Sequence, residues 1–205
     1  PGCVDDPLRE LEIQWQRFMD CGARPSHYSK KFDIVIFGAS GYVGYMMMEY
    51  LKRTVLKRKR DSFTLAFAGR SASKVAEMRN REFSGTAWAE TPILTASFDD
   101  AASIMDLARS AHVVVNCASS YIPMEGRVLV DACIWCKTDY VDISQEIPWT
   151  RHLKDLHGAA AEAGIIVAPG CANNAYSDLG VFLLAKKIRN DFGEATRCAV
   201  CYCSG

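Results

Sequence analysis

The chain has 205 residues, 49% of them hydrophobic, and is therefore long enough to bury a sizeable core. Its 24 basic and 24 acidic side chains balance, so nothing in its charge indicates a nucleic-acid partner or a charged membrane surface. No apolar run approaches the roughly 20 residues that cross a bilayer. We therefore expect a globular chain without a transmembrane segment.

The first 31 residues mix acidic and basic side chains, which fits neither a signal peptide nor an acid-poor transit peptide. Their apolar residues predict one short amphipathic helix over about 6–19. We therefore expect residues 1–31 to form a partly helical N-terminal extension. Because the chain starts with Pro1 and not with methionine, we expect the natural N-terminus to lie further upstream.

A strand, a glycine-rich turn and a helix follow the extension directly. Residues 32–37 read Phe-Asp-Ile-Val-Ile-Phe, which is typical of a buried parallel strand, and a helix is predicted over 42–57. Glycine has no Cβ, so a ligand can approach the turn closely, and the free N–H groups of the first helical turn favour pyrophosphate. The glycine spacing is G-x-x-G-x-x-G. We predict a dinucleotide-binding loop made of Gly38, Ser40, Gly41, Tyr42, Val43 and Gly44. The alternative is a tight turn without a ligand.

Strands and helices alternate along the rest of the chain, which is typical of an α/β fold with a doubly wound parallel sheet, the Rossmann arrangement. Further strands are predicted at 63–68, 92–96, 112–117, 140–143, 165–168 and 195–203. Helices are predicted from Ser71 or Ser73 to 81, and at 99–110, 126–137, 149–163 and 177–190. We assign residues 32–205 to one dinucleotide-binding domain that ends at the start of a second domain absent from this chain.

The end of the second strand sets the expected cofactor preference. An NAD site normally places Asp or Glu there, but this chain reads Ala-Gly-Arg-Ser-Ala-Ser-Lys over 68–74. A guanidinium forms two hydrogen bonds to a phosphate. We therefore predict that Arg70, Ser71 and Lys74 bind the 2′-phosphate of NADP, and that NAD is the weaker cofactor. The alternative is that Arg70 is a solvated surface charge.

Small residues end the fourth strand, at Asn116, Cys117 and Ala118, and these are predicted to run beside the ribose and nicotinamide of the cofactor. Tyr121 carries the one phenol in that loop. Two roles stay open for it: it orients a substrate, or it covers the pocket.

Asp142 and Glu146 follow the fifth strand and complete the candidate catalytic groups with Tyr121. The alternative is that Glu146 or the nearby Ser144 caps the next helix. The chain shows no hydrolase triad, and neither Tyr42 nor Tyr121 is followed four residues later by the lysine of short-chain dehydrogenases.

The chain has nine cysteines, an odd number that fits reduced thiols in an intracellular protein. Cys133 and Cys136 have C-x-x-C spacing but fall late in a predicted helix, away from the N-terminus that would stabilise a thiolate. We expect them to be reduced and packed against the sheet. The four histidines show no metal-ligand spacing, and we expect no metal site.

Taken together, these segments resemble the saccharopine dehydrogenase-like oxidoreductases, a family that includes trans-acting enoyl reductases. The matching segments are 32–41, 68–71, 115–117, Tyr121 with Gly126, 131–133, 139–144 before Glu146, and 178–180. The resemblance implies an NADP-dependent oxidoreductase that transfers hydride to or from a carbonyl, imine or enoyl group of a small-molecule or lipid-like substrate. From this resemblance together with the cysteine count, we expect an intracellular location, either cytoplasmic or associated with mitochondria or lipid droplets.

Three positions depart from the family pattern, all on the expected cofactor or substrate rim. Ser119–Ser120 replace Gly-Pro before the tyrosine, Gln145 replaces a glycine, and Cys-Ala-Asn-Asn at 171–174 replaces Gly-Phe-Asp-Ser. Such changes fit a different substrate, but they also fit a non-catalytic Rossmann module that acts as a nucleotide sensor or a structural subunit. In either case we expect a protein partner or a further domain of the same polypeptide beside the sheet.

Overall fold

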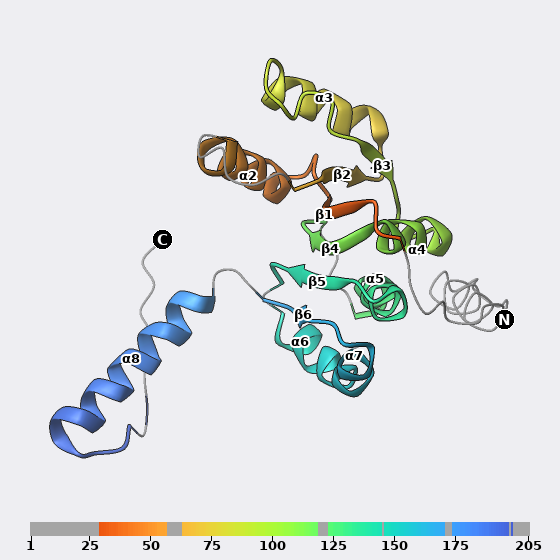
Figure 1. The fold of residues 1–205 in the computed structure, drawn as a ribbon. Coiled ribbons are helices and arrows are strands. Elements are labelled where there is room, and N and C mark those ends of the chain that lie inside the picture. Colours follow the sequence, from red (N-terminus) through yellow and green to blue (C-terminus); the bar gives the residue numbers. More distant parts are fainter. Residues whose placement is uncertain are drawn as a thin grey trace, which may run out of the picture.

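The computed structural model describes residues 29–56, 63–118, 123–144, 146–170, 174–196 and 198. Within them, six strands form one parallel sheet in the order β3-β2-β1-β4-β5-β6 (Figure 1). The strands are β1 (Phe32–Phe37), β2 (Leu65–Gly69), β3 (Ile93–Thr95), β4 (Ala111–Asn116), β5 (Asp139–Asp142) and β6 (Val167–Ala168). The predicted doubly wound parallel sheet is confirmed.

Except for the last one, the helices of the described residues divide between the two faces of this sheet. They are α2 (Tyr42–Tyr50), which continues into the π-helical turn η1 (Leu51–Leu56), α3 (Ala72–Phe83), α4 (Ala101–Ser110), α5 (Pro123–Cys136), α6 (Ile147–Lys154), α7 (His157–Ala163) and α8 (Asn174–Phe192). Helices α2 and α3 contribute to one core, whereas α4, α5, α6 and α7 contribute to the other. Two helical layers therefore enclose the sheet.

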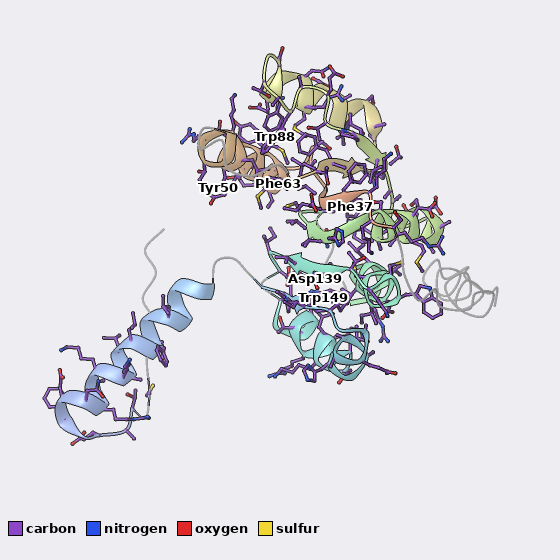
Figure 2. The ribbon with its side chains drawn as sticks, viewed as in Figure 1. Phe37, Tyr50, Phe63, Trp88, Asp139 and Trp149 are labelled. Carbon is purple, nitrogen blue, oxygen red and sulfur yellow. The ribbon has the colours of Figure 1, made fainter. Side chains whose placement is uncertain are left out.

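Strand β1 lies at the centre and contributes to both cores, because successive side chains of a strand point to opposite faces. Val35 and Phe37 belong to the core under α4 and α5, whereas Ile36 belongs to the core under α2 and α3. Aromatic rings pack on the core under α2 and α3, where Phe63 and Trp88 meet edge to face with ring centroids 5.8 Å apart (Figure 2). A strand buried on both faces explains the apolar run at 34–37.

Two predicted helices differ from the observed ones. The helix predicted over 42–57 is α-helical only to Tyr50, after which six residues are π-helical. The single helix predicted over 149–163 is two helices, because the amides of Asp155 and Leu156 donate to carbonyls only three residues back and tighten the chain there. The predicted stop at Gly164 is confirmed, since this glycine adopts the left-handed conformation with φ of 73°.

The region after β6 also differs from expectation. The predicted seventh strand is not formed at Ala195, Thr196 or Cys198, and its other residues, Cys201 among them, lie outside the described part of the chain. The predicted N-terminal helix also lies outside it. Helix α8 stands apart from the sheet (Figure 1) and exposes large apolar side chains, with Phe182 61% exposed. Of the helices that the structure describes, α8 included, none is long and apolar enough to cross a membrane.

Candidate functional site

The turn between β1 and α2 requires glycine at two positions. Gly38 has φ of +83°, and a Cβ there would lie 2.4 Å from the backbone nitrogen of Ala118. A Cβ on Gly44 would lie 2.4 Å from the carbonyl oxygen of Ala39. No side chain fits at either distance, so the glycines let the turn pack directly against the end of β4 and against the start of α2.

Helix α2 begins with its first amides uncapped by a side chain. Gly41 occupies the N-cap position and can provide no side-chain cap, and the first turn carries no acidic residue. The Gly41 amide donates to the Gly38 carbonyl at 3.0 Å, which closes the turn ahead of the helix. The remaining N–H groups and the helix dipole make this helix start a favourable place for a phosphate.

A cleft of about 510 Å³ opens above this turn. It lies where β1 meets β4, the point at which the strand order reverses and ligands of such sheets bind. Eight residues predicted for the cofactor site line it: Gly38, Ser40, Gly41, Tyr42, Val43, Arg70, Cys117 and Ala118. The turn, the end of β2 and the end of β4 thus meet in one cleft.

The end of β2 presents a cation without a neighbouring acid on the same strand end. Arg70 is exposed, lines the cleft and forms no ion pair with any residue that the structure describes. Ser71 caps α3 by accepting a hydrogen bond from the Lys74 amide at 3.4 Å, which confirms the predicted cap. Ser71 and Lys74 do not line the cleft, so Arg70 is the group best placed for a phosphate.

Sequence reasoning missed the third side of the cleft, formed by the loop after β3. Ser97, Phe98 and Asp99 line it, and Phe98 packs edge to face on Phe37 with ring centroids 5.2 Å apart. Asp100 then starts α4 by accepting hydrogen bonds from the amides of Ala102 and Ser103. These residues follow the carboxyl end of a strand, and that position is the signal from which they could have been predicted.

Asn116 supports the cleft from below. It is fully buried, and its Oδ1 accepts a hydrogen bond from the Ala118 amide at 3.0 Å, while its Nδ2 donates to the Tyr140 hydroxyl at 3.1 Å. The sequence prediction placed Asn116 on the cofactor surface. The structure instead places it under the loop that lines the cleft.

Asp142 was predicted to face the pocket, but the structure buries it completely. Its Oδ1 accepts hydrogen bonds from the Ser144 amide, the Ser144 hydroxyl and the Gly170 amide at 3.0, 2.7 and 2.8 Å. Its Oδ2 accepts from the Tyr140 hydroxyl at 2.9 Å and from the Trp149 indole at 3.0 Å. Five donors satisfy this carboxylate, which therefore holds strand ends together inside the fold.

The other two candidate catalytic residues have different outcomes. Glu146 is exposed and occupies the N-cap position of α6, but its side chain accepts no hydrogen bond from the helix amides. The alternative that the Glu146 side chain caps this helix is therefore wrong. Tyr121 lies outside the described residues.

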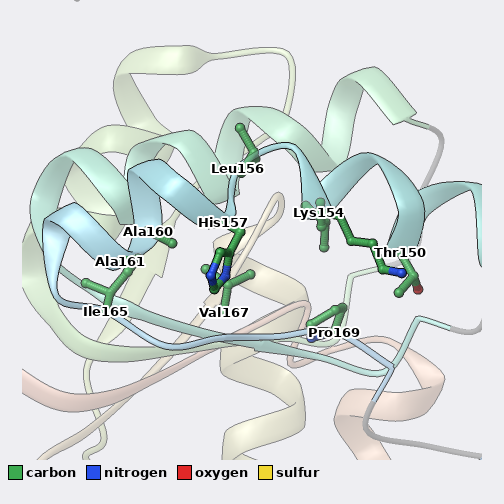
Figure 3. Close-up of a pocket in the computed structure, with 10 residues that line it drawn as sticks. Thr150, Lys154, Leu156, His157, Ala160, Ala161, Ile165, Val167 and Pro169 are labelled. Atoms are coloured by element: carbon green, nitrogen blue, oxygen red, sulfur yellow. The ribbon is translucent and has the colours of Figure 1, made fainter.

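A second cavity, of about 630 Å³, lies between α6, α7 and β6 (Figure 3). Leu153, Leu156 and Val167 are among its lining residues, and the same three residues belong to or pack on the core of that face. None of the predicted site residues lines it. This cavity is the open end of the core beside the edge strand β6.

The buried thiols have raised pKa values and are therefore poor nucleophiles at neutral pH. Cys133 and Cys136 on α5 are free and fully buried, as predicted, and burial raises the pKa of Cys136 to about 11. Burial likewise raises the pKa of the cleft-lining Cys117 to about 11, which keeps it protonated at neutral pH. Within the ranges that the structure describes, no group of three or more His, Cys, Asp or Glu side chains is placed to hold a metal ion.

The sheet order, the glycine turn and the cleft at the switch point define a Rossmann-type dinucleotide-binding domain. Residues 34–168 match the saccharopine dehydrogenase NADP-binding domain, and the chain belongs to that family. NADP is accordingly its cofactor. The residues present fit this group, because the start of α2 has no side-chain cap and lines the same cleft as Arg70, which forms no ion pair with any residue that the structure describes.

Several curated proteins are similar to this chain. A Mycobacterium tuberculosis protein provisionally named a trans-acting enoyl reductase is 36% identical over 170 residues, which cover 82% of this chain and 39% of that protein. A lipid droplet localized protein of Caenorhabditis elegans is 32% identical over 168 residues, covering 80% of this chain and 38% of that protein. The chain thus spans less than two fifths of the length of these relatives.

A solved structure shows the same fold. Saccharopine dehydrogenase (L-Glu forming) from Saccharomyces cerevisiae superposes with a TM-score of 0.59 at 17% identity. The match covers 78% of this chain and 32% of the yeast enzyme.

Proposed function

We propose that this domain binds NADPH for an oxidoreductase that transfers hydride to or from a carbonyl, imine or enoyl group. The observation that carries the proposal is the cleft, in which an uncapped helix start and an exposed arginine lie on two neighbouring strand ends. When bound, NADPH supplies the hydride, and the protein supplies its position and surroundings.

Each part of the cleft has a proposed partner on the cofactor. The residues at 40–43 would hold the pyrophosphate at the start of α2, and Arg70 would bind the 2′-phosphate. Cys117 and Ala118 would border the ribose and nicotinamide at the end of β4. NADP should accordingly be preferred over NAD, because no acid follows β2 to bind a free 2′-hydroxyl.

For the proton that accompanies hydride transfer, we propose Tyr121 and Glu146 as candidate groups. Glu146 is exposed at the start of α6, on the loop that follows β5. Asp142 is removed from this set, because five internal donors already use both of its oxygens.

A second candidate function is a non-catalytic nucleotide sensor or structural subunit. One observation favours it: at the β4 end of the cleft, the titratable side chain among the described lining residues is Cys117, whose thiol burial keeps protonated. Replacement of the family's Gly-Pro by Ser119–Ser120 points the same way. Binding without turnover would support this alternative.

We also propose that a further protein surface, from a partner or from another domain of the polypeptide, covers helix α8. Phe182, Leu183 and Leu184 are consecutive residues, so they lie on different sides of this helix, and all are exposed. A helix with apolar residues all round is normally buried. The buried free thiols of Cys117, Cys133 and Cys136 support an intracellular location.

The proposed function is tested by titrating the chain with NADPH and with NADH, using a matched pair of glycine variants. Gly41→Leu places a side chain over the start of α2, and it should abolish NADPH binding while the chain still unfolds cooperatively. Gly158→Leu is the control, because a Cβ there has nothing within 4 Å and Gly158 lies on α7, away from the cleft. Unchanged affinity in Gly41→Leu would contradict the proposed pyrophosphate site.

A further inference from the structure

A buried chain of hydrogen bonds joins the ends of three neighbouring strands. It runs from the Ala118 amide to Asn116, from Asn116 to Tyr140, and from Tyr140 to Asp142. Asp142 then accepts from the Gly170 amide just after β6. Asn116, Tyr140 and Asp142 are all 0% exposed, so water does not compete for these bonds.

The strand register explains why these side chains meet. Asn116 of β4 and Asp142 of β5 are direct partners across the parallel pair. Tyr140 lies two residues before Asp142, so both side chains point to the same face of β5. The Tyr140 ring belongs to the core under α5, and only its hydroxyl reaches the polar chain.

The direction of each bond is fixed. Burial, and next the charge of Asp142, raise the pKa of Tyr140 well above its usual range, so the phenol keeps its proton and donates a hydrogen bond to Asp142. The Tyr140 oxygen is then an acceptor for the Asn116 Nδ2, which can only donate. The amide of Asn116 is thereby oriented with Oδ1 toward Ala118.

We infer that Tyr140 is a positioning residue for the nicotinamide half of the cofactor, acting through Asn116 on the backbone at Ala118; this inference rests on the proposed function. Ala118 lines the cleft, and its nitrogen lies 2.4 Å from the point where a Gly38 Cβ would be. A shift of this backbone would either close the cleft against Gly38 or widen it. Tyr140 touches no part of the cleft itself.

The two ends of the cofactor should respond differently to loss of this hydroxyl. The adenosine 2′-phosphate end is assigned to Arg70 after β2, which takes no part in the hydrogen bonds that run from Ala118 to Gly170. The nicotinamide end is assigned to the β4 end, which the chain holds. The fragment 2′,5′-ADP contains the first end only, whereas NADPH contains both.

The test is to measure the dissociation constants of 2′,5′-ADP and NADPH for the chain and for Tyr140→Phe. The variant keeps the buried ring and removes only the hydroxyl. NADPH affinity should fall roughly threefold to thirtyfold, in line with the loss of one or two buried hydrogen bonds. The affinity for 2′,5′-ADP should not change, and Tyr50→Phe on α2, an exposed position, should change neither.

The outcomes separate this inference from the proposed function. If the unaltered chain binds neither ligand, the proposed function is overturned. If it binds both but Tyr140→Phe weakens both equally, or neither, Tyr140 is only a packing residue and the inference is overturned. If Tyr140→Phe does not fold, Asn116→Ala replaces it, and the same selective loss of NADPH affinity is required.

Discussion

The two halves of the sheet build their strand ends in opposite ways. In the first half, the cleft beside β1 and β2 is shaped by missing side chains, since Gly38 and Gly44 leave no room even for a Cβ. In the second half, the ends of β4, β5 and β6 are joined by buried polar side chains, with Asp142 accepting five hydrogen bonds. Backbone contact defines one half and side-chain contact defines the other.

This difference predicts whether a substitution in each half changes ligand binding or the stability of the fold. A ligand that approaches backbone amides needs an open surface, so the first half should tolerate changes that leave the glycine turn intact. The second half excludes water, so any donor left without its acceptor remains unpaired inside the protein. Substitutions in the first half should therefore alter binding, whereas substitutions in the second half should alter stability first.

The largest expected effect comes from removing the acceptor at the centre of the second half. Asp142→Ala leaves the Trp149 indole, the Tyr140 hydroxyl and the Gly170 amide without their partner. Because each unsatisfied buried donor costs about 1–3 kcal/mol, the free energy of unfolding should fall by about 3–5 kcal/mol. Urea denaturation followed by tryptophan fluorescence measures this.

Asp155→Ala is the matched control for this prediction. Asp155 is exposed where α6 ends, and its replacement should change the free energy of unfolding by no more than about 0.5 kcal/mol. Similar losses for the two variants would show that the buried acceptor has no special role, and the contrast between the two halves would not hold.

The same contrast explains what the sequence could predict. Gly38, Gly41 and Gly44 lie within seven residues, directly between an apolar strand and a helix, so their spacing alone locates the turn. Arg70 was predicted because the carboxyl end of β2 can be recognised from its apolar run. Each of these signals comes from residues that are neighbours in the sequence, so it can be recognised before the fold is known.

The buried chain in the second half has no such local signal. Asn116, Tyr140, Trp149 and Gly170 are brought together only when β4, β5 and β6 align in register. Asp142 was therefore predicted as a pocket residue, since a carboxylate at a strand end has the same sequence pattern whether it faces a ligand or an interior donor. The break between α6 and α7 was missed for a related reason, because two hydrogen bonds decide it and neither Asp155 nor Leu156, where it falls, is a helix-breaking residue.

The next largest effect should appear in the first half and should concern binding alone. Arg70→Ala removes a cation that would form charge-assisted hydrogen bonds to the 2′-phosphate, a contribution of about 1.5–3 kcal/mol. NADPH affinity should therefore fall roughly tenfold to 150-fold, while NADH affinity and the free energy of unfolding stay nearly unchanged. Isothermal titration with both cofactors measures the difference.

Arg189→Ala on α8 serves as the control for Arg70, because it removes the same charge from an exposed helix outside the cleft. It should leave both affinities as they are. Equal losses of NADPH and NADH affinity in Arg70→Ala would show that this arginine does not recognise the 2′-phosphate.

The smallest expected effect concerns Asp131 on helix α5, which packs on the second half of the sheet. Burial raises the pKa of this carboxyl from its usual 3.8, and Arg127, 3.1 Å away, only partly opposes the shift. The folded protein therefore binds the proton more tightly than the unfolded chain does, so the ionised carboxylate lowers stability at neutral pH. Stability from this group should rise as the pH falls through the folded pKa, and the rise ends near 3.8.

Asp131→Asn removes this titration and should raise the free energy of unfolding at pH 7 by less than about 1 kcal/mol. The advantage over the unaltered chain should shrink as the pH is lowered toward 4, because the carboxyl of the unaltered chain then becomes protonated in the folded state. Urea denaturation of both proteins at pH 7 and at pH 4.5 measures the two differences. A variant that is clearly less stable at pH 7 would mean that the ion pair with Arg127 outweighs the burial of Asp131. The ionised Asp131 on α5 would then stabilise the fold, as the buried Asp142 is expected to do in the interior.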